Sequence, residues 1–454
     1  MNAVLHDTAP RTELDPSTAS RRAVRSVAWF RNALAGNHLL RSSIFLTAAS
    51  AVTAGLGFVF WTVVARLFVP AQVGVATSLI STISLISYLS LFGLNSTVVR
   101  FFSTSPRKNA FATQAIVGVT VSSLVLGLLA YLLLVPGREE MSGVRSFPWF
   151  PAIFLASCVF AAVNLLSDSF FIAMRRSQYN VLTDGVVQGL TKLALPVALV
   201  TLGSVGILLS TSVAALLAGA VSLILARRVL GLRVHASTKR TEVITRVRYS
   251  GGAYVANVFY LLPILLVPLI VLDQLGPAAA GYYYIAYQVS NLLNAIGTAV
   301  GESTLAEGSY AEAEYRHLLR RSALLLSVTV VPAALLLALV SGVVMRVFGP
   351  AYVANATTLL QLLAINAVFV AMITWANFAL KIVGRLKTLL VANVAYFVLM
   401  LGLSALVVRH GLVWAGLAWV ASGLVVSTFL VVMTIRSARV GAPCISAGTE
   451  EGRS

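Results

Sequence analysis

Ionisable and amide side chains recur along one apolar segment, at about positions 181 to 201. Asp184, Gln188 and Lys192 follow one another at spacings of four, and Asn180 continues the series. In a helix this spacing places them on one face. At a rise of ~1.5 Å per residue, Lys192 lies roughly 17 Å along the segment. If the segment spans a membrane, an ionisable group at that depth is costly and marks either a paired structural site or a functional one.

A second acidic residue, Asp168, lies in the preceding apolar segment, one helical turn from Asn164 and roughly 10 Å deep by the same arithmetic. Three interpretations of these charges stay open. Asp168 and Lys192 form an ion pair that holds the helices together. Alternatively, Lys192 offers a cation to an anionic group of a substrate. In the third interpretation, Asp168 and Asp184 form a relay for a proton or another ion.

Neutral polar side chains form stripes on four other apolar segments. At intervals of three or four residues, which place them on one helix face, they are Thr77, Ser81, Ser84 and Ser87; Tyr284, Gln288, Asn291 and Asn294; Thr47, Ser50 and Thr53; and Tyr254, Asn257 and Tyr260. Serine and threonine can join helices within a bundle. Amides are costly to bury unpaired in lipid, so Asn257, Gln288, Asn291 and Asn294 favour a hydrated cleft.

The chain lacks the residue sets of most enzymes. No Gly-x-x-x-x-Gly-Lys-Ser/Thr loop is present, and the five histidines lie in tails or loops. The two cysteines, Cys158 and Cys444, provide neither a disulfide framework nor a metal cluster. No outer loop offers an acidic catalytic site of useful size. We therefore expect a transport protein with no catalytic residue, no metal and no cofactor.

Composition predicts a polytopic helical membrane protein. Of 454 residues, 58% are hydrophobic and 11% are charged. Continuously apolar stretches long enough to cross a bilayer predict twelve helices near 42–65, 74–97, 111–135, 148–174, 181–201, 204–226, 250–273, 278–300, 321–343, 353–380, 388–408 and 411–435.

The basic residues predict the orientation of these helices. With the N-terminus inside, 27 of the 33 Lys and Arg residues fall in inner segments and five in outer loops, with Lys192 inside a span. This bias follows the positive-inside rule and predicts that both termini are cytoplasmic. The same bias indicates that the net charge of +18 serves contacts with the anionic headgroups of membrane lipids. It does not indicate binding to nucleic acid.

The chain contains an internal duplication. Pro70-Ala71-Gln72-Val73-Gly74 returns 207 positions later as Pro277-Ala278-Ala279-Ala280-Gly281, each time between two apolar segments. Six spans per copy predict two pseudo-symmetric six-helix lobes in parallel orientation, with a cleft between them. The predicted parts are a disordered cytoplasmic tail at 1–40, an N-lobe at 41–228, a cytoplasmic linker at 229–249, a C-lobe at 250–436 and a cytoplasmic tail at 437–454.

Two features of the duplication bear on function. Arg66 and Asp273 occupy equivalent positions just before the two turns and have opposite charge, which predicts an outer gate between the lobes. In contrast, the equivalents of Asp168, Asp184 and Lys192 are Trp375, Val391 and Leu399. Any charged site is therefore asymmetric.

The first hairpin resembles a known family. The stretch Ser43–Phe101 contains Phe60-Trp61-Thr62-Val63-Val64-Ala65-Arg66-Leu67, then the turn at Pro70, then Leu91-Phe92-Gly93-Leu94. It is similar to the opening of Wzx-type polysaccharide flippases of the MOP superfamily, which also holds MATE drug exporters. The resemblance implies a bacterial inner-membrane protein that moves undecaprenyl-pyrophosphate-linked oligosaccharide to the outer leaflet. The anionic pyrophosphate and the glycan hydroxyls suit Lys192 or Arg66 and the amide faces.

We interpret the chain as a multi-pass flippase for a lipid-linked oligosaccharide, working by alternating access, with polysaccharide polymerases or glycosyltransferases as further partners. Two rivals stay open. A proton- or sodium-coupled multidrug exporter needs Asp168 and Asp184 to change protonation or bind an ion, although the spans at 42–65 and 250–273 lack the carboxylate common in such exporters. A scaffold that gathers glycosyltransferases through its basic loops requires no cleft.

Overall fold

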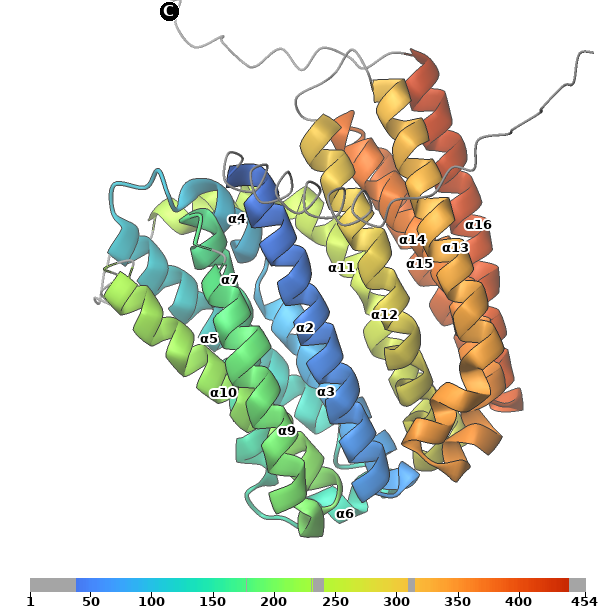
Figure 1. The fold of residues 1–454 in the computed structure, drawn as a ribbon. Coiled ribbons are helices and arrows are strands. Elements are labelled where there is room, and N and C mark those ends of the chain that lie inside the picture. Colours follow the sequence, from blue (N-terminus) through green and yellow to red (C-terminus); the bar gives the residue numbers. More distant parts are fainter. Residues whose placement is uncertain (1–37, 177, 230, 232–240, 309–314, 441–454) are drawn as a thin grey trace, which may run out of the picture. The chain divides into compact units, whose positions relative to one another are not determined.

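A computed structural model of the 454-residue chain describes all residues except 1–37, 177, 230, 232–240, 309–314 and 441–454. The described part is helical and contains no strand. Its elements (Figure 1) are α2 (His38–Leu67), α3 (Pro70–Ser90), α4 (Leu94–Phe101), α5 (Lys108–Leu134), η1 (Glu139–Met141), α6 (Ser142–Arg145), α7 (Phe150–Ala173), α8 (Gln178–Asn180), the π-helix η2 (Val181–Gln188), α9 (Gly189–Ala198), η3 (Val200–Leu202), α10 (Ser204–Val229), α11 (Thr241–Leu275), α12 (Pro277–Gly308), α13 (Tyr315–Phe348), α14 (Pro350–Ile382), α15 (Leu386–Val407), η5 (Val408–His410) and α16 (Leu412–Val440).

The chain divides into two compact units, Met1–Ala51 and Val52–Ser454. The described part of the first unit is the beginning of α2. The second unit holds every other element, and the packing described below lies within it. Most of the predicted tails at 1–40 and 437–454 lies outside the described residues. So does most of the predicted linker at 229–249, of which the described end belongs to α11.

Two sets of helices pack within Val52–Ser454. In the N-lobe, α7 packs against α3, α5 and α10, and α10 contacts η2 and α9. In the C-lobe, α14 packs against α12, α13 and α16, and α15 packs against α11 and α16. The two sets meet where α3 contacts α12 and α11. The duplicated order of helices predicted from the sequence is present in this arrangement.

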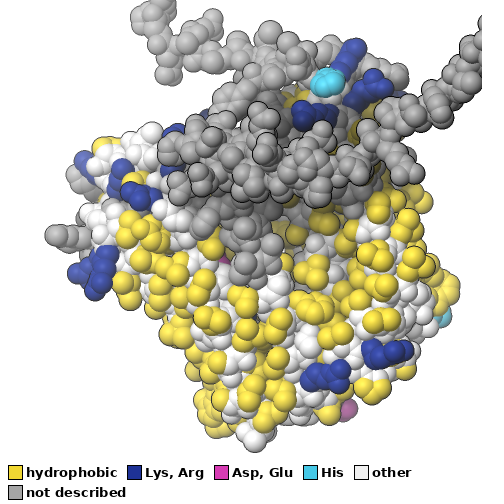
Figure 2. All heavy atoms as spheres, viewed as in Figure 1, with side chains coloured by type: hydrophobic (Ala, Val, Ile, Leu, Met, Phe, Trp, Pro, Cys, Tyr) yellow, Lys and Arg dark blue, Asp and Glu magenta, His cyan; other side chains and the backbone are white. Residues whose placement is uncertain are grey.

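A wide apolar surface surrounds these helices. Figure 2 shows hydrophobic side chains along the helices, with Lys and Arg side chains gathered towards the two ends. Leucine and valine side chains on α5 and α13 are highly exposed; the exposed fraction is 79% for Leu133 and 84% for Leu339. Such side chains lose contact with water when lipid covers them. The prediction of an all-helical multi-pass membrane protein is confirmed.

The number of spans stays a prediction. In the described part, nine helices are long and apolar enough to cross a membrane, and Thr53–Leu67 forms a shorter apolar helix. Two further predicted spans fall below that measure for physical reasons. The span at 181–201 is divided into η2 and α9 and carries two charges, whereas α12 carries tyrosine, glutamine and asparagine side chains.

Several predicted boundaries are wrong. The predicted span at 74–97 ends early because Phe92 and Gly93 have φ of 43° and 80°, a left-handed conformation that stops a helix and suits glycine. The chain then forms the short helix α4. At the other lobe, α11 begins at Thr241, inside the predicted linker, so it is longer than the predicted span.

The two Pro-Ala-x-x-Gly turns lie directly against each other. Pro70 and Pro277 begin α3 and α12. At this first position of a helix, an amide N–H would have no partner within the helix, so proline loses no hydrogen bond there. A β-carbon added to Gly74 would overlap the carbonyl oxygen of Pro277 and lie 2.8 Å from the amide nitrogen of Gly281. A β-carbon on Gly281 would overlap the carbonyl oxygen of Pro70. Repeat-related glycines thus let the two lobes meet through their backbones. We call this end of the helices the turn end.

Gly74→Leu is expected to hold the turn end open, because its side chain would collide with backbone, which cannot move aside cheaply. Spin labels at the exposed positions Val69 and Val413, in a background without Cys158 and Cys444, report the distance between the lobes. The variant should shift the distribution to longer distances.

The control is Gly402→Leu, because a β-carbon at Gly402 meets nothing within 4 Å. Its distance distribution should equal that of the unmodified chain. An unchanged distribution in a folded Gly74→Leu protein would contradict the proposed role of this contact.

Candidate functional site

The charged side chains predicted on the fourth and fifth spans lie together inside the N-lobe. A cavity of about 290 Å³ is enclosed by α3, α7, η2, α9 and α10. Five of the predicted site residues line it: Ser84, Asp168, Asp184, Gln188 and Lys192. Tyr88 on α3 and Asn164 on α7 complete its polar wall. We call this the N-lobe cavity.

A pair of glycines orients the charged helix. Gly185 and Gly189 form a Gly-x-x-x-Gly face, the spacing that lets membrane helices approach closely. A β-carbon on Gly185 would lie 3.1 Å from Thr53 Oγ1, and one on Gly189 would lie 2.8 Å from Leu56 Cδ1. This face therefore packs on α2. Asp184 and Gln188 each precede a glycine by one residue, about a quarter turn away, and so face the interior of the lobe.

The wide turns of η2 help to align the polar groups. Residues 181–188 form a π-helix, in which backbone bonds span five residues rather than four. Residues four apart consequently lie closer to one line than in an α-helix. The Lys192 ammonium donates to Gln188 Oε1 at 2.7 Å. Such wide turns occur frequently at functional sites.

The two carboxyl groups interact with each other and with an asparagine. Asn164 Nδ2 donates to Asp184 Oδ1 at 2.8 Å, and the carboxyl group of Asp168 lies beside that of Asp184. Carboxylate oxygens only accept hydrogen bonds, so a bond between two carboxyl groups needs one shared proton. Together with Lys192, a pair that holds one proton gives a cavity with no net charge.

The ion pair between Asp168 and Lys192, one of the three interpretations left open, is not formed in the structure. Within the described residues, the ion pair that forms at 4.0 Å or less is Arg138–Asp273. Lys192 extends along its own helix to Gln188, and the carboxylate that acts on its charge is Asp184. Asp168 instead lies near Asn180, whose Nδ2 donates to the Asp168 carbonyl oxygen at 3.3 Å. One buried carboxyl oxygen, Asp168 Oδ1, has no partner among the described atoms.

A second, smaller cavity lies between the lobes. It measures about 220 Å³ and is lined by Gln288 and Asn291 of α12 opposite Ala54, Gly57 and other residues of α2. The Trp61 and Tyr284 rings meet edge to face at 4.8 Å, and Gln288 Nε2 donates to Tyr284 Oη at 3.3 Å. The amide groups here face a surface of α2 made by Ala54, Gly57, Phe58 and Trp61. We call this the interlobe cavity.

The predicted site residues therefore do not form one cleft. The N-lobe and interlobe cavities share no lining residue. Ser81 is 4% exposed, Asn257 is exposed on α11, and Asn294 Nδ2 donates to Asn291 Oδ1 at 3.0 Å. The polar residues predicted on α3 do not join the interlobe cavity, because Ser84 and Ser87 line the N-lobe cavity. Thr47 and Ser50 lie where side chains are not described.

The predicted gate pair is also not formed. Arg66 Nε donates to the carbonyl oxygen of Val347 at 2.7 Å, and its Nη2 to that of Arg346 at 2.9 Å. These carbonyls belong to the last turn of α13, where a cation is favoured. Asp273 instead pairs with Arg138 at 3.3 Å. Each predicted residue thus bridges the lobes at the turn end with a different partner.

The C-lobe replaces the charged cavity with aromatic packing. Trp419 Nε1 donates to Tyr283 Oη at 2.9 Å, and Tyr283 stacks on Tyr287 with centroids 6.2 Å apart. Trp375, the predicted equivalent of Asp168, is buried and donates to Ser322 Oγ at 2.9 Å. Large aromatic side chains pack in this interior, and the polar atoms of Trp375 and Trp419 find partners. The predicted asymmetry of charge between the lobes is present.

Sequence reasoning missed several contributors. Ser157 and Ser212 bond across the N-lobe cavity at 2.6 Å, although single serines in apolar segments carry no distinctive signal. Arg138 lies in a loop, so its spacing could not identify Asp273 as its partner. Tyr254 donates to the carbonyl oxygens of Tyr88 and Leu89 at 3.1 and 2.9 Å and thereby joins α11 to the end of α3. The Gly185-x-x-x-Gly189 spacing was the one available signal for how η2 packs.

Solved structures show the same fold at low sequence identity. The lipid II flippase MurJ in an inward closed conformation has a TM-score of 0.72 and 13% identity, covering 86% of this chain and 87% of that one. An inward-facing multidrug resistance MATE family transporter of the MOP superfamily has a TM-score of 0.61 and 15% identity, covering 85% and 95%. A MOP superfamily transporter from Pyrococcus furiosus gives 0.59 and 13%, covering 88% and 95%. The chain has the MOP fold.

The sequence itself matches a family model. No curated protein matches the chain. The model described as polysaccharide biosynthesis protein matches residues 39–305, more than half of the chain. The match includes both Pro-Ala-x-x-Gly turns and the polar residues of both cavities. The expected family is confirmed: the chain belongs to the polysaccharide biosynthesis protein family, and it has the fold of MOP superfamily transporters.

Proposed function

We propose that the protein flips a polyprenyl-linked oligosaccharide from the inner to the outer leaflet of the bacterial inner membrane by alternating access. The observation that carries this proposal is the reciprocal contact of Gly74 and Gly281 beside a cavity lined with amides. The family supports a role in polysaccharide biosynthesis. The fold is shared with a protein described as a lipid II flippase.

In the proposed orientation, the turn end faces outward. The excess of Lys and Arg belongs to the opposite end, which the positive-inside rule assigns to the cytoplasm. The backbone contact, Arg66 and the Arg138–Asp273 pair then hold the lobes together on the outer side. On the inner side, Tyr254 bonds the end of α3 through two backbone carbonyls. Alternating access requires these two sets of contacts to break in turn.

The size of the interlobe cavity supports a closed state. Sites for drug-sized ligands usually measure about 300–1,000 Å³, whereas this cavity measures about 220 Å³. An oligosaccharide therefore enters only when the lobes separate. On separation, Gln288 and Asn291 offer both donors and acceptors, which matches the hydroxyl groups of a glycan.

Removing these amides should abolish transport. In cells that lack the gene, we expect polyprenyl-linked oligosaccharide to accumulate in the inner leaflet and surface glycan to disappear. The unmodified chain should restore both, whereas Gln288→Leu with Asn291→Leu should not, because the opened cleft would lose its hydrogen-bonding groups. Extracted lipid-linked glycan and surface polysaccharide are the two measurements.

The matched control is Asn355→Leu, which removes an exposed amide that bonds its own helix at Ala351. It should complement fully at equal expression. Normal surface glycan in the deletion strain would reject the flippase function, and full complementation by the double variant would reject the role of the amides.

The Asp168–Asp184 pair favours a second candidate, an ion-coupled drug exporter. Its carboxyl groups can hold a proton, or bind a cation together with Asn164, within the N-lobe cavity. This function requires the deletion strain to become more sensitive to cationic drugs, and Asp184→Asn to remove resistance while the folded protein is retained.

Drug susceptibility decides between the two functions. We expect unchanged minimum inhibitory concentrations in the deletion strain. Asp184→Asn would disturb ion coupling under either function, so glycan accumulation is measured beside resistance. Increased sensitivity with normal surface glycan would establish the exporter instead.

A further inference from the structure

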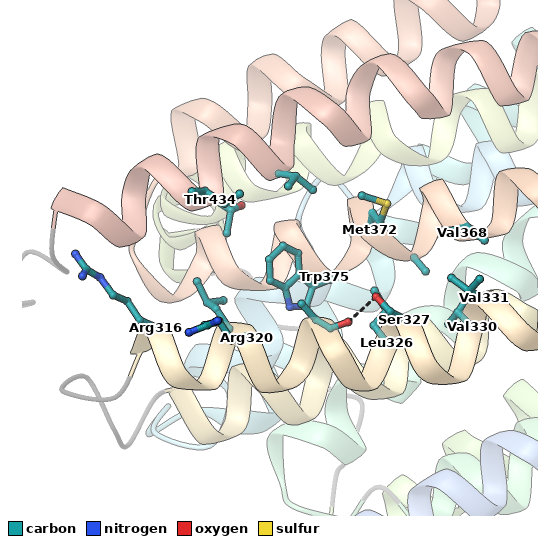
Figure 3. Close-up of a pocket in the computed structure, with 15 residues that line it drawn as sticks. Arg316, Arg320, Leu326, Ser327, Val330, Val331, Val368, Met372, Trp375 and Thr434 are labelled. Carbon is teal, nitrogen blue, oxygen red and sulfur yellow. Dashed lines mark hydrogen bonds between the residues drawn. The ribbon is translucent and has the colours of Figure 1, made fainter.

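A long groove on the C-lobe belongs to neither polar cavity. It lies among α13, α14 and α16 and has a volume of about 760 Å³ (Figure 3). Eleven of its fifteen lining residues are apolar. Leu326, Val330 and Ala371 are almost fully buried along its wall, whereas Val331 is 37% exposed. The groove shares no lining residue with the N-lobe or interlobe cavity.

The uncharged polar groups of the groove are already bonded within the protein. Ser327 Oγ donates to the Ala323 carbonyl oxygen at 2.9 Å, as Figure 3 shows. Thr434 Oγ1 donates to the Leu430 carbonyl oxygen at 2.9 Å, and Trp375 Nε1 donates to Ser322 Oγ at 2.9 Å. The donors of these three side chains are therefore occupied. A sugar or peptide, which needs many hydrogen-bond partners, matches such a wall poorly.

Positive charge lies at one end of the groove. Arg316 and Arg320 are exposed and one turn apart on α13, so both can reach the same group. Figure 3 shows them at the opposite end of the groove from Val330, Val331 and Val368. From Arg316 to Val331 the helix rises roughly 22 Å. The hydrocarbon of one leaflet is about half of the ~30 Å core, so the groove extends from headgroup level past the membrane centre.

We propose that this groove binds an anionic glycerophospholipid of the cytoplasmic leaflet. One acyl chain lies along α13, α14 and α16, and the phosphate accepts hydrogen bonds from Arg316 and Arg320. Guanidinium groups bind phosphate with charge-assisted, often bidentate geometry. Basic pockets at the cytoplasmic ends of membrane helices are typical headgroup sites.

A resident lipid fits the groove better than the transported lipid does. A cargo held with its phosphate at Arg316 would keep its glycan away from Gln288 and Asn291, which line a separate cavity. A lipid that remains bound instead supplies α13, α14 and α16 with the contacts that an empty groove would lose. This inference does not depend on which substrate the protein moves.

The test counts lipids that stay bound to the purified full-length protein. The protein is reconstituted in nanodiscs of phosphatidylcholine with one fifth phosphatidylglycerol, then released into mild detergent and weighed by native mass spectrometry. The unmodified chain should retain phosphatidylglycerol in preference to phosphatidylcholine. Arg316→Gln with Arg320→Gln should lower that retention roughly tenfold, because each cation near the membrane surface contributes separately to anionic binding.

Two comparisons separate this site from general attraction to the membrane. Arg227→Gln with Arg228→Gln removes an exposed pair at the end of α10, so it should leave retention unchanged. Ala323→Phe fills the groove while keeping both arginines and should lower retention as strongly as the charge variant. Arg316→Lys with Arg320→Lys keeps the charge and should retain most of the lipid. If the glutamine variant does not fold, Ala323→Phe and this lysine variant still test the proposal.

Three results would overturn the proposal. One is equal retention of phosphatidylcholine and phosphatidylglycerol. Another is an equal loss in the Arg227 and Arg228 variant, which would assign the effect to diffuse surface charge. The third is a lipid-free dimer as the main species, which would mean that a second copy of the chain covers the groove.

Discussion

The lobes meet where Gly74 and Gly281 bring two helix backbones into direct contact. Lipid tails are as apolar as the helices, so membrane helices associate through close packing rather than through the hydrophobic effect. Each glycine lies against the first residue of the other repeat's helix, and a single methyl group on either one would overlap a carbonyl oxygen. The remaining bridges at the turn end, from Arg66 and Arg138, are exposed side-chain contacts whose contribution depends on this backbone fit.

The fold was predictable where it followed from the internal repeat or from the periodic spacing of residues along a helix. Hydropathy located the helices, and the 207-residue offset identified the turns that meet. Helix spacing also placed Asp184, Gln188 and Lys192 on one face. The partners across helices were not predictable, because they depend on rotation about each helix axis. Gly185 and Gly189 set that rotation for the charged helix, and Lys192 consequently extends to Gln188 rather than to Asp168. Similarly, the turn at Phe92 and Gly93 lies inside an apolar run that hydropathy treats as continuous.

Duplication gave the lobes one architecture, and their interiors then diverged. The N-lobe keeps a cavity of about 290 Å³ with two carboxyl groups and an ammonium group. In the related region of the C-lobe, Trp375, Tyr283, Tyr287 and Trp419 pack instead. A packed aromatic interior resists deformation. The polar cavity changes its charge when a proton or ion enters. The N-lobe therefore holds the ionisable groups, while α12 of the C-lobe packs against α3.

Arg66 illustrates a contact between the lobes that can be exchanged for water. Its guanidinium group is exposed and bonds two carbonyl oxygens that end α13. Terminal carbonyls at a helix end accept bonds from water equally well, so solvent replaces the arginine as the contact breaks. Exchange of this one contact for water therefore changes the free energy little. In the proposed alternating access, such a solvent-exchangeable bridge would oppose separation of the lobes only weakly.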